Sequence, residues 1–344
     1  MKKTDLHQGT LNMLVLKVFN REPSHGSGIC QRFQQSLAMS RRLIAVVLVF
    51  IACAGDAAAQ SRVETNVVYG MYSGLALLLD VHYPAAPNGY GVVFVAGSGW
   101  RAPLGYGATG LKEAEGQISL WGPPLLRAGY TVFAINHRAA PRFQYPAALE
   151  DVQRAVRFVR HNARRFGVDG TMLGGVGGLS GGHLVVLVAT LGAPGKTDDP
   201  DPVNREPATL QAVVLRAAPS DMRLLGATPI GGVAVGSFMG RAFKGTTDDD
   251  RDFGAASPIA HVSSSSPPTL LLHGDADDTV PYQQSLEMER ALRRASVPVK
   301  LVRVAGGAHG ATFTMDTTPH AQLPAVLDEM IGWLGRYMKT VRAK

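Results

Sequence analysis

A glycine-rich pentapeptide in the middle of the chain holds a serine that could act as a nucleophile. Gly178–Gly182 reads Gly-Leu-Ser-Gly-Gly, with small and apolar residues before it and the apolar run His183–Thr190 after it. This order predicts a buried strand, a sharp turn and a buried helix, and glycines let strand and helix approach closely at such a turn. The helix N-terminus behind Ser180 favours developing negative charge. A lone Gly-x-Ser-x-Gly is a weak signal, and an incidental serine in a glycine-rich loop is the alternative.

Asp277 and His309 supply the two groups that a serine hydroxyl needs. Asp277 follows the apolar run Leu270–Leu272, and His309 follows Leu301–Val304 in a glycine-rich loop. An imidazole takes the proton of the hydroxyl, and a carboxylate holds that imidazole in the correct tautomer. The order Ser, Asp, His, with each residue just after a predicted strand, is that of α/β-hydrolases. Because parallel strands end at one edge of a sheet, the sequence predicts that the three side chains meet there.

The elements that must position these residues alternate between strands and helices. This rhythm predicts an α/β fold with a mostly parallel central sheet and helices on both faces. An insertion near residues 221–262 is weakly patterned, and it is either a cover over the site or a plain surface loop. Strands are expected at Val67–Tyr69, Leu75–Tyr83, Val92–Val95, Thr131–Ile135, Met172–Val176, Gln211–Leu215, Thr269–Leu272 and Lys300–Val304, and helices at Pro146–Phe166 and Pro324–Lys339.

From about Val67 to its end, the chain resembles α/β-hydrolase esterases and lipases. It is most similar to the feruloyl and acetyl-xylan esterase group, and it shares motifs with prolyl-oligopeptidase-type hydrolases. In the motif His-Gly-x-x-Asp-x-x-Val-Pro, the resemblance implies that Asp277 is the acid, rather than Asp275 or Asp278. The matching segments are Leu125–Arg138, Tyr145–Asp151, Ala255–Val262 and His273–Pro281.

One segment departs from this family. Where the family usually has His-Gly-Gly-Gly-Trp after the third strand, this chain has Ala96-Gly-Ser-Gly-Trp100. Oxyanion stabilisation uses backbone N–H groups, so those of Ser98 and Gly99, together with that of Gly181, are expected to form the oxyanion hole. The alternative is that this segment is only a turn between a strand and a helix. The loss of the histidine leaves the shape of the loop and the substrate range open.

The N-terminal part has the character of a secretory leader. After Met39 come a basic pair, an apolar run and Ala57-Ala-Ala59, which predict a signal peptide cleaved before Gln60. A lipoprotein anchored at Cys53 and a twin-arginine signal are the rival interpretations. Residues 60–344 then form the hydrolase domain, in a secreted or periplasmic protein.

Residues 1–38 have a different character. Lys3–Val18 and Ser24–Phe33 resemble the first helices of a PadR-type winged-helix regulator. Because no recognition helix or wing follows, DNA binding is not implied. We interpret this segment as a remnant or an over-extended start.

Charge and cysteine content narrow the classes of partner. The formal net charge of the chain is +7, but residues 60–344 carry only +3, which gives no reason to expect a nucleic-acid partner. Both cysteines, Cys30 and Cys53, precede Gln60. The acidic runs Asp198–Asp201 and Asp248–Asp252 lack the spacing of a calcium loop. The histidines at 82, 137, 161 and 183 lack zinc spacing and are expected to be structural, so no metal or organic cofactor is expected.

These observations predict a serine esterase. Ser180 is expected to attack the ester carbonyl, His309 to act as base and then acid, and Asp277 to orient His309. The resemblance implies short acyl or feruloyl esters of carbohydrates as substrates. A prolyl-oligopeptidase-type peptidase and a catalytically inactive hydrolase-fold binding protein are the alternatives, and a DNA-binding regulator has only residues 1–38 in its favour. The oligomeric state is left open.

Overall fold

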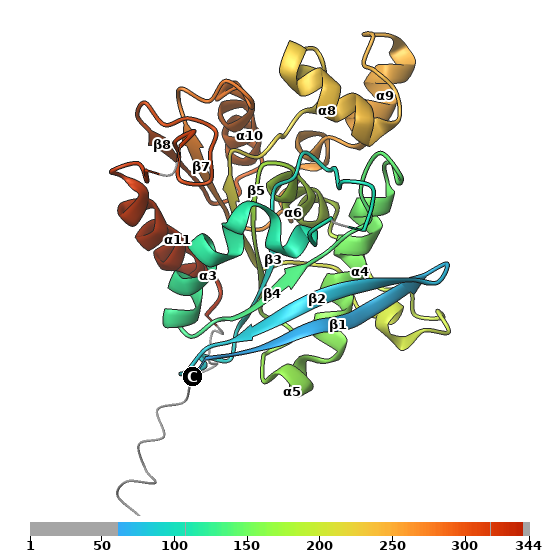
Figure 1. Ribbon diagram of the computed structural model, residues 1–344, viewed down its shortest axis with the longest axis vertical. Coiled ribbons are helices and arrows are strands. Elements are labelled where there is room, and N and C mark those ends of the chain that lie inside the picture. Colours follow the sequence, from blue (N-terminus) through green and yellow to red (C-terminus); the bar gives the residue numbers. More distant parts are fainter. Residues whose placement is uncertain (1–60, 107, 317, 340–344) are drawn as a thin grey trace, which may run out of the picture. The chain divides into compact units, whose positions relative to one another are not determined.

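The computed structural model describes residues 61–106, 108–316 and 318–339 (Figure 1). The expected leader at 39–59 and the PadR-like segment at 1–38 lie outside the described residues. Among the described helices, none has the length and the apolar character needed to span a bilayer.

The described residues form a sheet with strand order β1-β2-β4-β3-β5-β6-β7-β8. β1 and β2 form an antiparallel hairpin and β2 pairs antiparallel with β4, whereas the pairs from β4 through β8 are parallel. The predicted α/β class and the mostly parallel sheet are therefore confirmed. The strands are β1 (Arg62–Tyr72), β2 (Leu75–Tyr83), β3 (Gly91–Val95), β4 (Thr131–Ile135), β5 (Leu173–Gly178), β6 (Ala212–Arg216), β7 (Thr269–Gly274) and β8 (Val299–Val304).

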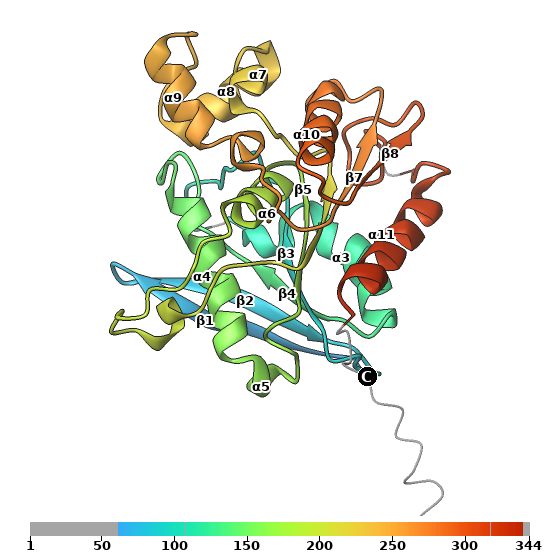
Figure 2. The ribbon, with the colours of Figure 1, turned by 180° about the vertical axis from the view of Figure 1, so that it is seen from behind.

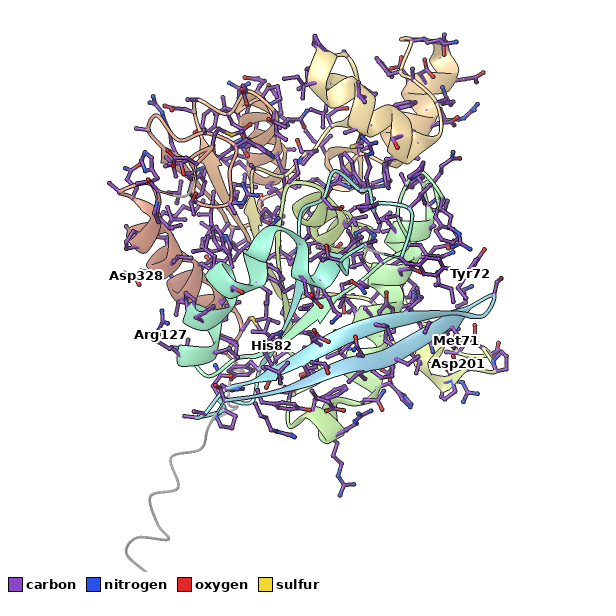
Figure 3. The ribbon with its side chains drawn as sticks, in the orientation of Figure 1. Met71, Tyr72, His82, Arg127, Asp201 and Asp328 are labelled. Atoms are coloured by element: carbon purple, nitrogen blue, oxygen red, sulfur yellow. The ribbon has the colours of Figure 1, made fainter. Side chains whose placement is uncertain are left out.

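The hairpin extends beyond the parallel part of the sheet. Its turn end carries the exposed apolar side chains of Met71 and Tyr72 (Figure 3). β2 has the expected bounds, whereas β1 is longer than the expected Val67–Tyr69, because its paired backbone continues at both ends.

Helices cover both faces of the sheet and build two apolar cores. Alternate residues of a strand face opposite cores, so Val93 and Val95 join one core while Val92 and Phe94 join the other. Figure 1 views the face that α3 covers, and Figure 2 views the face that α6 covers. The helices of the first core are α4 (Ala147–His161), α6 (Leu179–Leu191) and α10 (Gln283–Arg294), with α5 (Ala163–Phe166) after α4, and those of the second are α3 (Gln117–Arg127) and α11 (Leu323–Tyr337).

The insertion after β6 is helical. Each helix begins at a polar residue that caps it: the Asp221 side chain accepts from an N–H of the first helix, and Thr228 and Thr246 do so for the next two. The plain-loop alternative for this insertion is wrong, because the helices bury Val235, Phe238 and other apolar residues. The elements are α7 (Met222–Gly226), α8 (Pro229–Met239), α9 (Thr247–Ala255) and the short 3₁₀ helix η3 (Pro258–His261); η1 (Leu111–Gly116) and η2 (Pro202–Arg205) lie elsewhere.

Candidate active site

The turn between β5 and α6 is the elbow that the sequence predicts. β5 ends at Gly178 and α6 begins at the next residue, without a connecting loop. A Cβ atom on Gly177 would lie 2.7 Å from the Gly181 carbonyl group, and one on Gly181 would lie 2.1 Å from the carbonyl oxygen of Val95. Glycine is therefore required at both positions. The residue midway between them, Leu179, has φ of +49°, a left-handed conformation that leucine rarely adopts.

Ser180 follows this strained residue and lies inside the first turn of α6. Its side chain is fully buried. Its Oγ accepts a hydrogen bond of 2.9 Å from the backbone N–H of Ser98, in the loop after β3. Ser180 and the expected oxyanion loop are thus brought together, with one of the expected oxyanion donors bonded to the serine hydroxyl.

His309 is held by a carboxylate at the same edge of the sheet. Its Nδ1 lies 2.8 Å from Oδ2 and 3.0 Å from Oδ1 of Asp277, so Nδ1–H donates to that carboxylate. Asp277 Oδ1 also accepts from the backbone N–H groups of Thr279 and Val280, at 2.9 and 2.8 Å. The imidazole is therefore fixed in orientation and tautomer, with Nε2 left as the acceptor.

Burial and hydrogen bonding have opposite effects on the pKa of Asp277. Burial alone would raise its pKa, but His273 and His309 together with the backbone donors hold the pKa well below the ordinary range. His273 Nε2 lies 3.3 Å from Asp277 Oδ2. The carboxylate is therefore ionised at neutral pH beside His309.

The two neighbouring aspartates have other partners. Asp275 pairs with Arg303 and accepts from the backbone N–H of Gly306, while Asp278 is exposed and accepts from the Thr279 hydroxyl. Of the three candidates, only Asp277 bonds His309.

Nε2 of His309 is the atom that would take a proton from a nucleophile. It is buried and has no hydrogen-bond partner among the described residues. The structure therefore pairs Asp277 with His309 and Ser180 with Ser98, but it does not join Ser180 to His309 by a hydrogen bond.

A glutamine that the sequence analysis did not single out braces the oxyanion loop. Gln117, the first residue of α3, accepts from the N–H of Gly97 at 2.9 Å and donates to the Gly97 carbonyl at 3.0 Å. A Cβ on Gly97 would lie 2.8 Å from Cβ of Leu179, so this loop packs directly against the elbow. A single buried glutamine gives no spacing signal in a sequence, and only the fold shows its role.

Trp100 and His183 tie this loop to the elbow helix and to the insertion. Trp100 Nε1 donates to His183 Nδ1 at 3.0 Å, and His183 Nε2 lies 2.8 Å from the Ala256 carbonyl oxygen. Because the indole only donates, Nδ1 must accept and Nε2–H must donate. The Trp100 ring also stacks on Phe238 of α8, with ring centroids 4.9 Å apart. Burial lowers the pKa of His183 to about 4, so the ring is neutral in its structural role.

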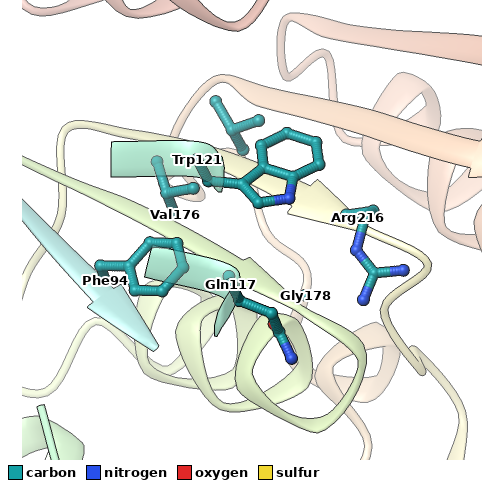
Figure 4. Close-up of a pocket in the computed structure, with 8 residues that line it drawn as sticks. Phe94, Gln117, Trp121, Val176, Gly178 and Arg216 are labelled. Carbon is teal, nitrogen blue, oxygen red and sulfur yellow. The ribbon is translucent and has the colours of Figure 1, made fainter. Parts of the chain in front are cut away.

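Arg216, at the end of β6, holds the loop that carries His309. Its Nη1 donates to the carbonyl oxygens of His309 and Gly310, at 2.5 and 3.1 Å. A Cβ on Gly178 would lie 2.9 Å from the same guanidinium group. Figure 4 shows Gly178 between the side chains of Gln117 and Arg216, at a cavity of about 10 Å³ that is large enough for one water molecule.

The described residues contain no group of three His, Cys, Asp or Glu side chains arranged to hold a metal ion. In the acidic run after Lys244, Asp249 completes the capping box of α9 with the N-cap residue Thr246, and Arg241 pairs with both Asp249 and Asp252. This run therefore serves the local structure of the insertion.

A parallel sheet whose carboxyl edge holds an elbow and an aspartate-bound histidine is the α/β-hydrolase arrangement. The sequence profile of the BD-FAE family matches residues 79–292, more than half of the chain, and the chain belongs to this family.

Two relatives from Mycobacterium tuberculosis carry esterase names. Esterase LipQ is 28% identical over 62% of this chain and 50% of its own length, and esterase LipC is 28% identical over 71% of this chain and 59% of its own length. The chain thus spans between half and three fifths of the length of these two proteins. Both of these relatives are named as esterases.

A solved structure gives the same result for the fold. A truncated carbohydrate esterase from gut microbiota superposes with a TM-score of 0.64 at 25% identity, over 83% of this chain and 99% of that one. The expected α/β-hydrolase fold is therefore confirmed.

Proposed function

We propose that the chain hydrolyses carboxylic esters, with His309 as the base and Asp277 as the carboxylate that orients it. The observation that carries this proposal is the pairing of His309 with the buried Asp277, in which Nε2 of His309 has no hydrogen-bond partner among the described residues and lies at the edge of the sheet that also holds the elbow. A partly buried imidazole with a fixed tautomer and an open acceptor is arranged to take a proton.

The chemistry needs three things from the site. Nε2 of His309 removes a proton from the attacking oxygen and returns it to the leaving alcohol. Asp277 stays ionised and stabilises the imidazolium that forms. Backbone N–H groups of the elbow helix and of the loop at Ser98 and Gly99 stabilise the oxyanion.

In the route expected from the sequence, Ser180 is the attacking group and an acyl-serine forms. That route requires Ser180 Oγ to exchange its bond to the Ser98 N–H for one to His309 Nε2. The missing Ser180–His309 bond also favours a second candidate, a hydrolase-fold protein that binds an ester without turning it over.

For the substrate, we propose short acyl or feruloyl esters of carbohydrates. The carbohydrate esterase with the same fold and 25% identity supports this choice. A panel of acetyl, butyryl, octanoyl and feruloyl esters, run beside a peptide substrate, tests it with wild-type protein and His309→Ala. We expect short acyl or feruloyl esters to be cleaved fastest and the variant to be at least 100-fold slower. If a folded wild-type protein cleaves no ester in the panel, the ester-binding protein without catalytic activity remains as the candidate function. Preferential cleavage of the peptide would favour a peptidase.

A further inference from the structure

We infer that the reactive position of this elbow is occupied by Leu179, one residue before Ser180, and that His309 activates a water molecule directly instead of a serine. This inference rests on the proposed ester hydrolysis and concerns its nucleophile. The reasons are the spacing of the glycines, the backbone conformation, the position of Leu179 and the Nε2 atom of His309, which has no hydrogen-bond partner among the described residues.

The glycines set the frame of the elbow, that is, which residue lies at the centre of the Gly-x-x-x-Gly turn. In a Gly-x-nucleophile-x-Gly turn, the two glycines let strand and helix touch, and the reactive residue lies midway. A Cβ on Gly177 would meet the backbone of Gly181, and a Cβ on Gly181 would meet the backbone of Val95 and Ala96. The residue midway between these two closely packed glycines is Leu179. The frame centred on Ser180 would use Gly178 and Gly182 instead. At those two positions a Cβ would first meet side chains, those of Arg216 and Ala218.

The backbone conformation agrees with this frame. The reactive residue of such an elbow occupies a strained turn that lifts its side chain above the sheet. The residue with positive φ is Leu179, at +49°, and it is partly exposed. Ser180 belongs to the helix and is fully buried, with its hydroxyl bonded to the Ser98 N–H.

Leu179 also has the neighbours that a reactive residue needs. On one side its Cβ packs against Gly97 of the oxyanion loop. On the other side, Arg216 contacts the preceding Gly178 and donates to the backbone carbonyl of His309. Leu179 therefore sits between the loop that stabilises an oxyanion and the loop that carries the base.

A leucine at this position explains why His309 Nε2 has no hydrogen-bond partner among the residues that the structure describes, because the leucine side chain has no polar atom to offer. An unpaired buried acceptor is costly, and a water molecule or a substrate atom would satisfy it. In the step we propose, Nε2 takes a proton from water while the water oxygen bonds to the acyl carbon. The bond from that carbon to the alcohol oxygen then breaks, and the imidazolium returns the proton to the alcohol. The products are the free acid and the alcohol, and no acyl-enzyme forms.

Covalent labelling tests the frame of the elbow. We expect intact-mass spectrometry to find no adduct on the wild-type protein after treatment with a fluorophosphonate probe, and to find one adduct on Leu179→Ser, at residue 179. Leu179→Ala is the matched control, because it removes the same side chain without adding a hydroxyl, and it should remain unlabelled. An adduct on Ser180 of the wild-type protein would overturn the inference, and so would a folded Leu179→Ser protein that takes up no probe.

Ester kinetics test the role of water. We expect Ser180→Ala to stay within about tenfold of the wild-type rate, while His309→Ala loses about 10²–10⁴-fold. A loss in Ser180→Ala as large as that in His309→Ala would restore the acyl-serine route. A wild-type protein without any esterase activity would instead contradict the proposed function. Labelling of Leu179→Ser would still show whether residue 179 or residue 180 lies at the centre of the elbow.

Discussion

At the scale of single residues, the site depends on which groups share a hydrogen bond. Three aspartates lie within the four residues after β7, and of these only Asp277 forms a hydrogen bond with His309. The acid motif identified this residue because its position relative to the Val-Pro pair is fixed. The serine could not be assigned in the same way, because the glycines of Gly177-Gly-Leu-Ser-Gly-Gly182 have the spacing of an elbow in two frames that differ by one residue, one centred on Leu179 and one on Ser180. Only φ of Leu179 and the backbone atoms that a Cβ on Gly177 or Gly181 would meet separate the two.

The first prediction concerns the orienting carboxylate. Asp277→Asn should lower the rate of ester hydrolysis by at least 100-fold, because His309 loses both its orientation and the charge that stabilises its protonated form. Asp275→Asn and Asp278→Asn are the matched controls and should stay within about threefold of the wild-type rate. Initial rates on an acetyl ester give the comparison. If Asp278→Asn proved as slow as Asp277→Asn, the assignment of the acid would have to change.

The second prediction concerns the glutamine that braces the oxyanion loop. Gln117→Ala should lower kcat more than it changes KM, because the loop loses its support while the remaining binding surface is kept. It should also lower the free energy of unfolding by about 1–3 kcal/mol, because the N–H and carbonyl of Gly97 lose their buried partner. Chemical denaturation measures this second effect. Gln283→Ala, at an exposed position of α10, should change stability by less than about 0.5 kcal/mol.

At the scale of elements, apolar runs predicted the central strands β3 to β7 because these strands are buried on both faces of the sheet. The helices of the insertion were not predicted, because they are short and α8 is rich in glycine and small apolar residues. Their caps at Asp221, Thr228 and Thr246 are visible in the sequence, but such residues are equally common in turns. Packing through Phe238 onto Trp100 stabilises the insertion, and that contact appears only in the fold.

The third prediction concerns the pH dependence of stability that comes from His183, which bonds Trp100 and the Ala256 carbonyl. His183 has a pKa near its ordinary 6.5 when unfolded and about 4 when folded, so the unfolded state binds its proton first as pH falls. Stability should therefore decrease between about pH 6.5 and 4, by up to about 1.4 kcal/mol per pH unit from this group. The buried His137, whose pKa is also lowered by burial, acts in the same direction. Urea denaturation across this pH range should show a shallower slope for His183→Asn than for the wild-type protein, and an equal slope would contradict the assignment.

At the scale of the whole molecule, we propose that residues 60–344 form the functional unit and that residues 39–59 direct its export. The described residues of this unit build two apolar cores, one on each face of the sheet. A protein comprising residues 60–344 should therefore fold and keep the ester-hydrolysing activity of the full chain.

The fourth prediction concerns processing. N-terminal sequencing of exported protein should begin at Gln60, because Ala57-Ala-Ala59 precedes it as a cleavage site. A lipid-modified Cys53 at the N-terminus would establish the lipoprotein interpretation. Intact protein starting at Met39 or earlier, recovered from the exported fraction, would contradict cleavage at this site.

The most direct test of ester hydrolysis by His309 is the release of acetate from an acetylated xylo-oligosaccharide by wild-type protein and by His309→Ala, measured side by side. Circular dichroism first establishes that both proteins are folded. We predict acetate release by the wild-type protein well above the buffer rate, and a rate at least 100-fold lower for the variant. Equal rates for the two proteins, or no release by the wild-type protein on this or any other ester, would contradict the proposed function.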